Sequence, residues 1–315
     1  MTLKASDLKF VLGLVGTIAV IAIALWLLDW DRLSAALARV SLRSVAECLA
    51  FCLLTHVLLG WRWALIAAPS DEPPRAADMF VAWQAGVFNL VTPAAIGADA
   101  YRVARGGERT GGRARTAGLV LLERLMGVWG NAAVFVVAYL ASWKAASSVP
   151  AFAVALPIFT AILVGLAAGV IVLRMTRLGL PAHLTGRTAD TARRVVAALT
   201  EHGPLRTFLA LALSTAGVAT WVLAASALGR SLAVDLGLEP VAMITVVTEF
   251  ARLMPISLQG IGVREATFAW LAHEAGGSGE AGFVACGLLY TLNYLVVSGL
   301  GLAGGFALKR RGSAG

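Results

Sequence analysis

Six runs of apolar residues, each long enough to cross a bilayer, dominate this chain of 315 residues. A transmembrane helix needs about 20 predominantly apolar residues. The runs occupy residues 10–28, 45–68, 117–142, 151–173, 205–228 and 281–308. Charged residues make up 14% of the chain, against about 25% in a typical soluble domain. We therefore expect an all-α integral membrane protein with six spanning helices in a single transmembrane domain, residues 1–315.

Two further apolar segments, at about 79–98 and 241–273, are each interrupted midway. In both, an apolar run ends at a proline and reaches an arginine nine residues later, with glycine and a carboxylate close by. The residues are Pro93, Gly97, Asp99 and Arg102 in the first segment and Pro255, Gly260, Gly262, Arg264 and Glu265 in the second. Proline removes a backbone donor and kinks a helix, and glycine permits a tight reversal. Each segment is therefore expected to form a re-entrant helical hairpin.

The basic loops predict the orientation, because Lys and Arg concentrate in cytoplasmic loops. The most basic segments are residues 99–115, 174–206 and 309–311. Placing all three in the cytoplasm puts the N- and C-termini inside and makes the two hairpins enter from opposite faces. The loop 29–44, with three arginines on the outside, counts against this arrangement.

This path divides the chain into two related halves. Residues 1–143 and 150–310 would each contain two helices, a hairpin and a helix, in an inverted-topology repeat. Residues 174–204 form a basic cytoplasmic loop, in which we expect an amphipathic helix at about 188–199.

Charged residues inside the spans indicate a site, since ionisable groups in a membrane are costly and usually face an interior path. Glu123 and Arg124 are adjacent and cannot face each other on a helix, so we expect them to pair elsewhere, for example with Arg102 and Asp99. Glu249 and Arg252 are three residues apart and can pair on one face. Such pairs either contact substrate or only clamp the hairpins in place.

An anion is the ligand that these residues favour. The helix after each break presents N–H groups and a positive dipole end, and a guanidinium can hold a phosphate with two hydrogen bonds. The candidate substrate-binding residues are Asn89, Pro93, Gly97, Asp99, Arg102, Glu123, Arg124, Glu249, Arg252, Pro255, Gly260, Gly262, Arg264 and Glu265. Arg62, between two tryptophans, is interpreted as snorkelling to the interface, and His56 as a packed polar residue.

Enzyme and cofactor motifs are missing from the sequence. It contains no nucleophile elbow, zinc-ligand spacing, phosphate-cradling loop or dinucleotide fingerprint. We therefore expect a non-enzyme with no cofactor and no metal. The formal net charge of +8 comes from loops beside helices, where anionic lipid headgroups explain it better than nucleic acid.

The chain resembles the flippase-like transmembrane region of lysylphosphatidylglycerol synthases, as a stand-alone member without a synthase domain. The resemblance rests on Asn89 through Arg102, on Leu122-Glu123-Arg124, and on Met254-Pro255 followed by Gly260-Ile261-Gly262-Val263-Arg264-Glu265. It implies a multi-pass protein of the bacterial inner membrane that handles lipids. Gly127 and Thr291 stand where the family often carries Asp and Arg.

Together these features predict a lipid flippase or transporter for an anionic or phosphate-headed lipid. The alternatives are an integral-membrane lipid-modifying transferase and a scaffold for lipid or envelope-glycan biosynthesis enzymes. Candidate partners are membrane lipids (phospholipid, polyprenyl-linked or hopanoid-type), a lipid-biosynthesis enzyme and a second copy of the chain.

Overall fold

The computed structural model describes residues 30–70, 72–89, 92, 96–106, 110–176, 186–254 and 257–312. All regular structure among these residues is helical, which confirms the all-α class for the described part of the chain. The first apolar run, residues 10–28, lies outside the described residues, as do Pro93 and Pro255.

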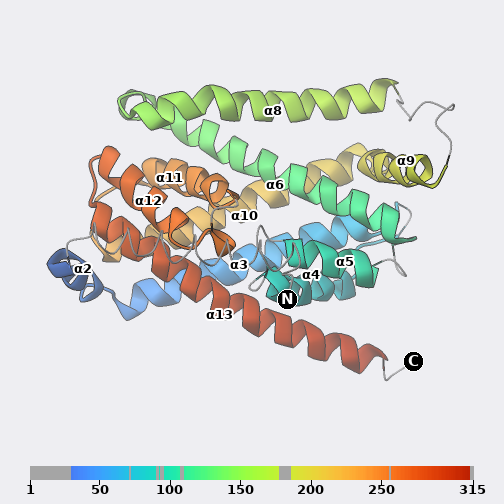
Figure 1. Cartoon of the computed structure of the whole chain (residues 1–315), viewed down its shortest axis with the longest axis horizontal. Helices are drawn as coiled ribbons and strands as arrows, with labels where there is room; N and C mark the ends of the chain where they lie inside the picture. Colours follow the sequence, from blue (N-terminus) through green and yellow to red (C-terminus); the bar gives the residue numbers. More distant parts are fainter. Residues whose placement is uncertain are drawn as a thin grey trace, which may run out of the picture.

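Five helices are long and apolar enough to cross a membrane, and they confirm five of the six predicted runs. They are α3 (Leu42–Ala67), α6 (Arg113–Ala141), α8 (Pro150–Thr176), α10 (Pro204–Ser231) and α13 (Gly279–Gly312). In Figure 1, α3, α8 and α13 run from left to right, and α6 and α10 run the opposite way. Local sequence marks where two of them begin. The Ser41 hydroxyl accepts from the Ser44 N–H ahead of α3, and Pro204 opens α10, where no N–H is needed.

Each interrupted segment folds as a pair of short helices packed against each other. The first pair is α4 (Ala76–Asn89) and α5 (Ile96–Gly106), and the second is α11 (Leu238–Ala251) and α12 (Val263–Glu274). A 3-10 turn, η2 (Leu258–Gly260), lies between α11 and α12. At 1.5 Å per residue the longest of these helices reaches about 21 Å, less than the hydrocarbon thickness of about 30 Å. The two pairs lie toward opposite ends of the molecule (Figure 1).

The packing of the long helices brings the two halves of the chain together. α3 packs along α10, α13 packs on α4, and α6 packs on α11. A Cβ at Gly304 would lie 2.7 Å from the Phe80 carbonyl oxygen, so glycine is needed where α13 crosses α4. α8 lies at the edge of the bundle (Figure 1) and exposes large apolar side chains such as Val154 and Val164. That exposure suits a surface that faces lipid.

Three shorter helices complete the described structure: α2 (Trp30–Leu37), α7 (Trp143–Ala146) and α9 (Arg187–Thr200). α9 confirms the helix predicted at about 188–199. It packs on α6, where Gly118 leaves room for the backbone of Val195.

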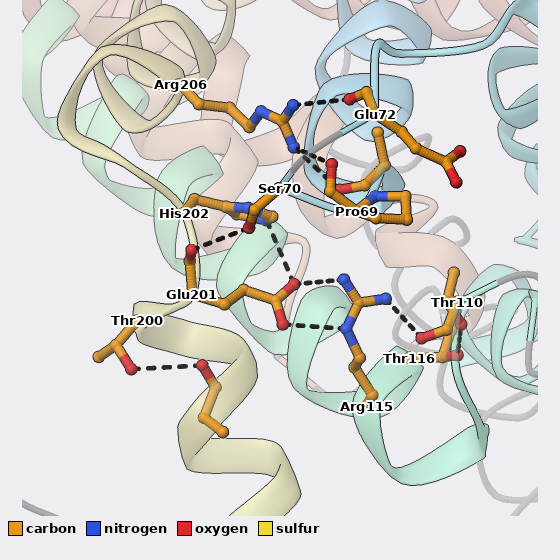
Figure 2. Close-up of polar contacts among 12 residues, drawn as sticks. Pro69, Ser70, Glu72, Thr110, Arg115, Thr116, Thr200, Glu201, His202 and Arg206 are labelled. Atoms are coloured by element: carbon orange, nitrogen blue, oxygen red, sulfur yellow. Dashed lines mark hydrogen bonds and ion pairs between the residues drawn. The ribbon is translucent and has the colours of Figure 1, made fainter.

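Two arginines fasten the turn between α9 and α10 to its surroundings (Figure 2). Arg206 donates to the carbonyl oxygens of Pro69 at 2.7 Å and Glu72 at 2.8 Å, in the connection between α3 and α4. Arg115, near the start of α6, donates through Nε to Glu201 at 2.9 Å. This turn therefore ties the end of α3 to the start of α6, beside the first helix pair.

Candidate functional site

A cavity of about 350 Å³, here called the main cavity, lies between the two helix pairs. Its wall includes six residues that the sequence predicts as substrate-binding: Asn89, Asp99, Arg102, Glu123, Arg124 and Arg252. A smaller cavity of about 230 Å³, the side chamber, shares Arg62, Gly127, Arg252 and Tyr290 with the main cavity and adds Asn131, Trp221 and Glu249. Residues about 190 positions apart in the sequence thus meet in one polar interior.

Glu123 on α6 is the central carboxylate of the main cavity. Its side chain is 8% exposed and accepts from two guanidinium groups. Arg62 Nη2 donates to Oε1 at 2.9 Å, and Arg102 Nη1 donates to Oε2. Arg62 also donates to the Ser214 hydroxyl at 3.0 Å. The predicted partnership of Glu123 with Arg102 is therefore confirmed, and Arg62 joins it.

Asp99 at the start of α5 links two more arginines. Arg102 donates to Oδ1 at 2.7 Å and Arg124 to Oδ2 at 2.5 Å. This confirms the expected pairing of Arg124 with Asp99. The Arg124 side chain is 42% exposed, so its guanidinium remains accessible from the cavity while it holds the carboxylate.

The wall of the main cavity carries more positive than negative charge. Among the described residues that line it, four are arginines and two are carboxylates, Asp99 and Glu123. Charges in a poorly hydrated interior interact more strongly than in water. The cavity is therefore suited to an anionic group.

The second helix pair contributes a separate ion pair. Arg252 donates through Nε to Glu249 at 2.7 Å, which confirms the predicted pairing on one face of α11. Glu249 also accepts from Trp221 Nε1 at 3.1 Å and from the Tyr290 hydroxyl. Glu249 is thus fully engaged, and Arg252 lines both cavities.

Arg264 and Glu265 lie outside the described lining of both cavities. Arg264 is 4% exposed and donates to Glu265 at 2.7 Å and to the Tyr294 hydroxyl at 2.7 Å. Its guanidinium lies 3.8 Å from the centre of the Tyr290 ring, within the range of a cation–π contact. Arg264 therefore contacts Tyr290 and Tyr294 of α13, which line the main cavity, without lining the cavity itself.

Glycine is required at the breaks, as the sequence predicts. Gly260 and Gly262 have φ of +70° and +83°, values that disfavour other residues. A Cβ at Gly97 would collide with the Phe88 carbonyl oxygen and the Thr92 hydroxyl. These glycines shape the turns that bring charged side chains to the cavity.

The expectation of free N–H groups at the helix starts is wrong at three positions. The Gly97 N–H donates to Thr92 Oγ1 and the Ala98 N–H to Asn89 Oδ1, each at 2.9 Å. The Gly262 N–H donates to Glu265 at 2.6 Å. Side chains of the chain itself thus occupy these three donors, which are not available to a ligand.

The interpretation of Arg62 as a snorkelling residue is also wrong. Arg62 is 8% exposed and turns inward to Glu123 and Ser214, partners that lie far away in sequence. His56, also treated as a packing residue, lines both cavities and pairs with Asn293 at 2.7 Å. The signal in the sequence was the charge itself, because an ionisable residue inside an apolar run usually faces an interior path.

The sequence of this chain matches one known protein family. The family model of the lysylphosphatidylglycerol synthase transmembrane region matches residues 10–301. No curated protein matches the chain. The family match includes both helix pairs and every residue named above in the walls of the two cavities. With five apolar helices and this match, the chain is a multi-pass membrane protein of a family tied to lipid metabolism. It belongs to the family defined by the transmembrane region of lysylphosphatidylglycerol synthases.

Proposed function

We propose that this protein is a flippase of the bacterial inner membrane, which moves an anionic, phosphate-headed lipid between the leaflets. The observation that carries the proposal is the set of four arginines around the main cavity: Arg62, Arg102, Arg124 and Arg252. Guanidinium groups bind phosphate through paired hydrogen bonds. Intramembrane arginines that face a cavity are typical of a substrate path.

Two re-entrant hairpins would give the lipid headgroup its route. The helices of α4/α5 and α11/α12 are each too short to cross a bilayer. Asp99 of α5 meets Arg252 and Gln259, from the break between α11 and α12, at the main cavity. Transport sites in other membrane proteins lie near the midplane, between broken helices of two related halves. A headgroup held there would exchange between the leaflets while its acyl chains stay in lipid.

The packing supports an inverted repeat behind these hairpins. α3 and α10 pair with each other, α13 packs on the first hairpin and α6 packs on the second. If each of α3, α4 and α6 is exchanged in this description with α10, α11 and α13, respectively, the same pairs of packed helices result. A two-fold relation between the halves accounts for this pattern.

Charge supports a cytoplasmic position for the end of the molecule drawn at the right of Figure 1. The end of α5, the start of α6, α9 and the end of α13 all lie there. These elements carry Arg105, Arg113, Arg193 and Arg310. The positive-inside rule then orients the chain with its C-terminus in the cytoplasm.

A leaflet-exchange assay tests the proposal. Full-length protein is reconstituted in vesicles with fluorescent phospholipids, and reduction of the outer-leaflet dye measures translocation. We expect exchange of phosphate-headed lipids, lowered about tenfold or more in Arg124→Gln, because one charge-assisted hydrogen bond is worth about 1.5–3 kcal/mol. Arg105→Gln is the matched control: it lies on α5, is exposed and lies outside the cavity lining.

Two outcomes would contradict the flippase. One is exchange no faster than in protein-free vesicles for every phosphate-headed lipid. The other is equal exchange by the Arg124 and Arg105 variants. Chromatography of the recovered lipids separates transport from a transferase reaction, since a flippase returns its lipid chemically unchanged.

A further inference from the structure

His56 on α3 brings a basic nitrogen to the interior that the main cavity and the side chamber share. Its side chain is half-buried, and Nε2 lies 2.7 Å from Oδ1 of Asn293 on α13. An amide oxygen only accepts hydrogen bonds, so Nε2 carries a hydrogen and donates it. In the neutral ring the other nitrogen, Nδ1, then has a free lone pair. No described residue donates to Nδ1, so this atom is able to take up a proton.

The carboxylates that face this interior are already bound by arginines. α5, α6 and α11 contribute one each, namely Asp99, Glu123 and Glu249, and each accepts from one of the four arginines around the main cavity. Those arginines keep their protons at any physiological pH. The ion pairs therefore hold fixed charges, with a proton on each arginine and none on the carboxylates.

The remaining elements around His56 add no other group that titrates near neutral pH. α13 contributes Tyr290 and Tyr294, whose hydroxyl groups bond to Glu249 and Arg264. α4 and α10 bring no ionisable side chain to the described linings. Imidazole is the side-chain group that ordinarily changes charge between pH 5 and pH 8. Within the described walls of the two cavities, His56 is thus the group suited to proton exchange.

The wall charges link this proton to the binding of an anion. The described linings of the two cavities together carry four arginines against three carboxylates, so one positive charge is in excess. Charges in a poorly hydrated interior interact strongly, and this excess opposes a further positive charge on His56. An anionic headgroup cancels the excess when it enters. Binding of the anion and binding of the proton therefore favour each other, by the same factor in both directions.

A proton bound together with the headgroup also changes the charge that crosses the membrane. A phosphodiester carries one negative charge, and charge is costly to move through a bilayer. The proton comes from the water on the side where the headgroup enters, binds Nδ1, and returns to the water on the side where the headgroup leaves. The lipid anion and the proton together move no net charge.

We propose that His56 takes up one proton with each anionic headgroup that enters the main cavity, and that this couples lipid exchange to the pH difference across the membrane. The inference rests on the proposed flippase function and adds a driving force to it. Asn293 is a positioning residue, because its bond to Nε2 leaves Nδ1 to receive the proton.

Proton uptake on binding tests the role of His56 in the full-length protein. Calorimetry in two buffers with different heats of ionisation counts the protons that accompany short-chain phosphatidylmethanol, whose phosphodiester does not titrate between pH 6 and pH 8. We expect uptake of up to one proton per lipid, with affinity rising at most about tenfold per pH unit as the pH falls. His56→Gln keeps a donor for Asn293 but has no basic nitrogen, so uptake should vanish. His273→Asn, exposed on α12, is the matched control and should keep it.

A second variant separates proton binding from a structural role of His56. Asn293→Asp places a carboxylate at Nε2, which stabilises the charged imidazolium. The pH range of proton uptake should therefore move to higher pH, whereas a residue that only packs would leave it unchanged. Uptake that persists in His56→Gln, or an unchanged pH range in Asn293→Asp, overturns the proposal.

Vesicles with an imposed gradient test the coupling itself. A pH difference without a membrane potential should make fluorescent phosphatidylmethanol accumulate in the leaflet on the alkaline side, and a potential without a pH difference should leave it evenly distributed. His56→Gln should abolish the accumulation. Accumulation driven by the potential alone would overturn electroneutral coupling.

The failure of this inference differs from the failure of the flippase. Exchange that depends on Arg124 but responds to neither the pH difference nor His56→Gln overturns the coupling and leaves the flippase in place. No exchange of any phosphate-headed lipid under any gradient overturns both.

Discussion

The side-chain amide of Gln259 donates to the backbone carbonyl of Asn89 and so joins the second helix pair to the first. The same amide donates to the Thr92 carbonyl at 2.5 Å. Asn89 is the last residue of α4, where carbonyl groups lack partners within the helix. A side chain from one half of the chain thus completes the hydrogen bonding of the other half at the main cavity.

Substitutions of Gln259 should separate the contribution that its side chain makes to stability from the cost of its backbone conformation. Gln259 has φ of +56°, in the left-handed region, which costs a non-glycine residue about 1–2 kcal/mol. Both Gln259→Ala and Gln259→Gly lose the two hydrogen bonds, at about 1–3 kcal/mol, but only glycine relieves the backbone. We expect melting temperatures in the order wild type, Gly, Ala. An alanine variant at least as stable as the glycine variant would contradict this assignment.

Local sequence predicted the helices and their breaks well, because apolar length and Pro/Gly interruption are properties of neighbouring residues. Spacing along one helix also predicted the Glu249–Arg252 pair. Partners that depend on packing between distant helices could not be found this way. The capping of the Ala98 N–H by Asn89 depends on how α4 folds back on α5, and the inward turn of Arg62 depends on the position of α6.

Removal of the Glu123 charge should destabilise the protein strongly. Glu123→Gln leaves Arg62 buried without its counter-ion, at about 3–5 kcal/mol, while Arg102 keeps Asp99. Glu47 is a matched control, since it also pairs with two arginines, Arg43 and Arg230. Its side chain is 30% exposed, so Glu47→Gln should cost less than about 1 kcal/mol.

A dye that fluoresces on reaction with a thiol measures the difference in stability between the two variants, because the cysteines of the chain report its unfolding. The three cysteines are buried and become reactive only as the fold opens. Glu123→Gln should therefore release dye signal at a clearly lower temperature than Glu47→Gln. Equal melting temperatures for the two variants would show that Glu123 is not a buried counter-ion.

The turn between α9 and α10 should make stability depend on pH. Burial lowers the pKa of His202 below its ordinary 6.5, and the nearby Arg206 lowers it further, although Glu201 opposes the shift. Below pH 6.5 the unfolded chain therefore binds a proton that the folded chain does not. This contribution to stability is complete above pH 6.5 and is lost progressively as the pH falls from 6.5 toward the lowered pKa.

Melting temperatures between pH 8 and pH 5 test this dependence. We expect the wild type to lose more stability below pH 6.5 than His202→Asn, which cannot take up the proton. His273→Asn, at an exposed position on α12, should follow the wild type. Parallel curves for the wild type and His202→Asn would contradict a role for His202 in the turn shown in Figure 2.

Gly260 should couple the backbone of the second break to the position of Arg252. A Cβ at Gly260 would lie 2.7 Å from the Arg252 Cα, and the φ of +70° adds about 1–2 kcal/mol of strain for any other residue. Gly260→Ala must therefore push Arg252 away from the cavity wall as well as destabilise the turn. Leaflet exchange and melting temperature should both fall.

Gly299→Ala is the control: it lies inside α13 with open space around it, and alanine there should stabilise the helix by about 0.5–1 kcal/mol. If Gly260→Ala lowered the melting temperature but left exchange unchanged, the position of Arg252 would not matter for transport, and the four-arginine site would reduce to the three arginines of α3, α5 and α6.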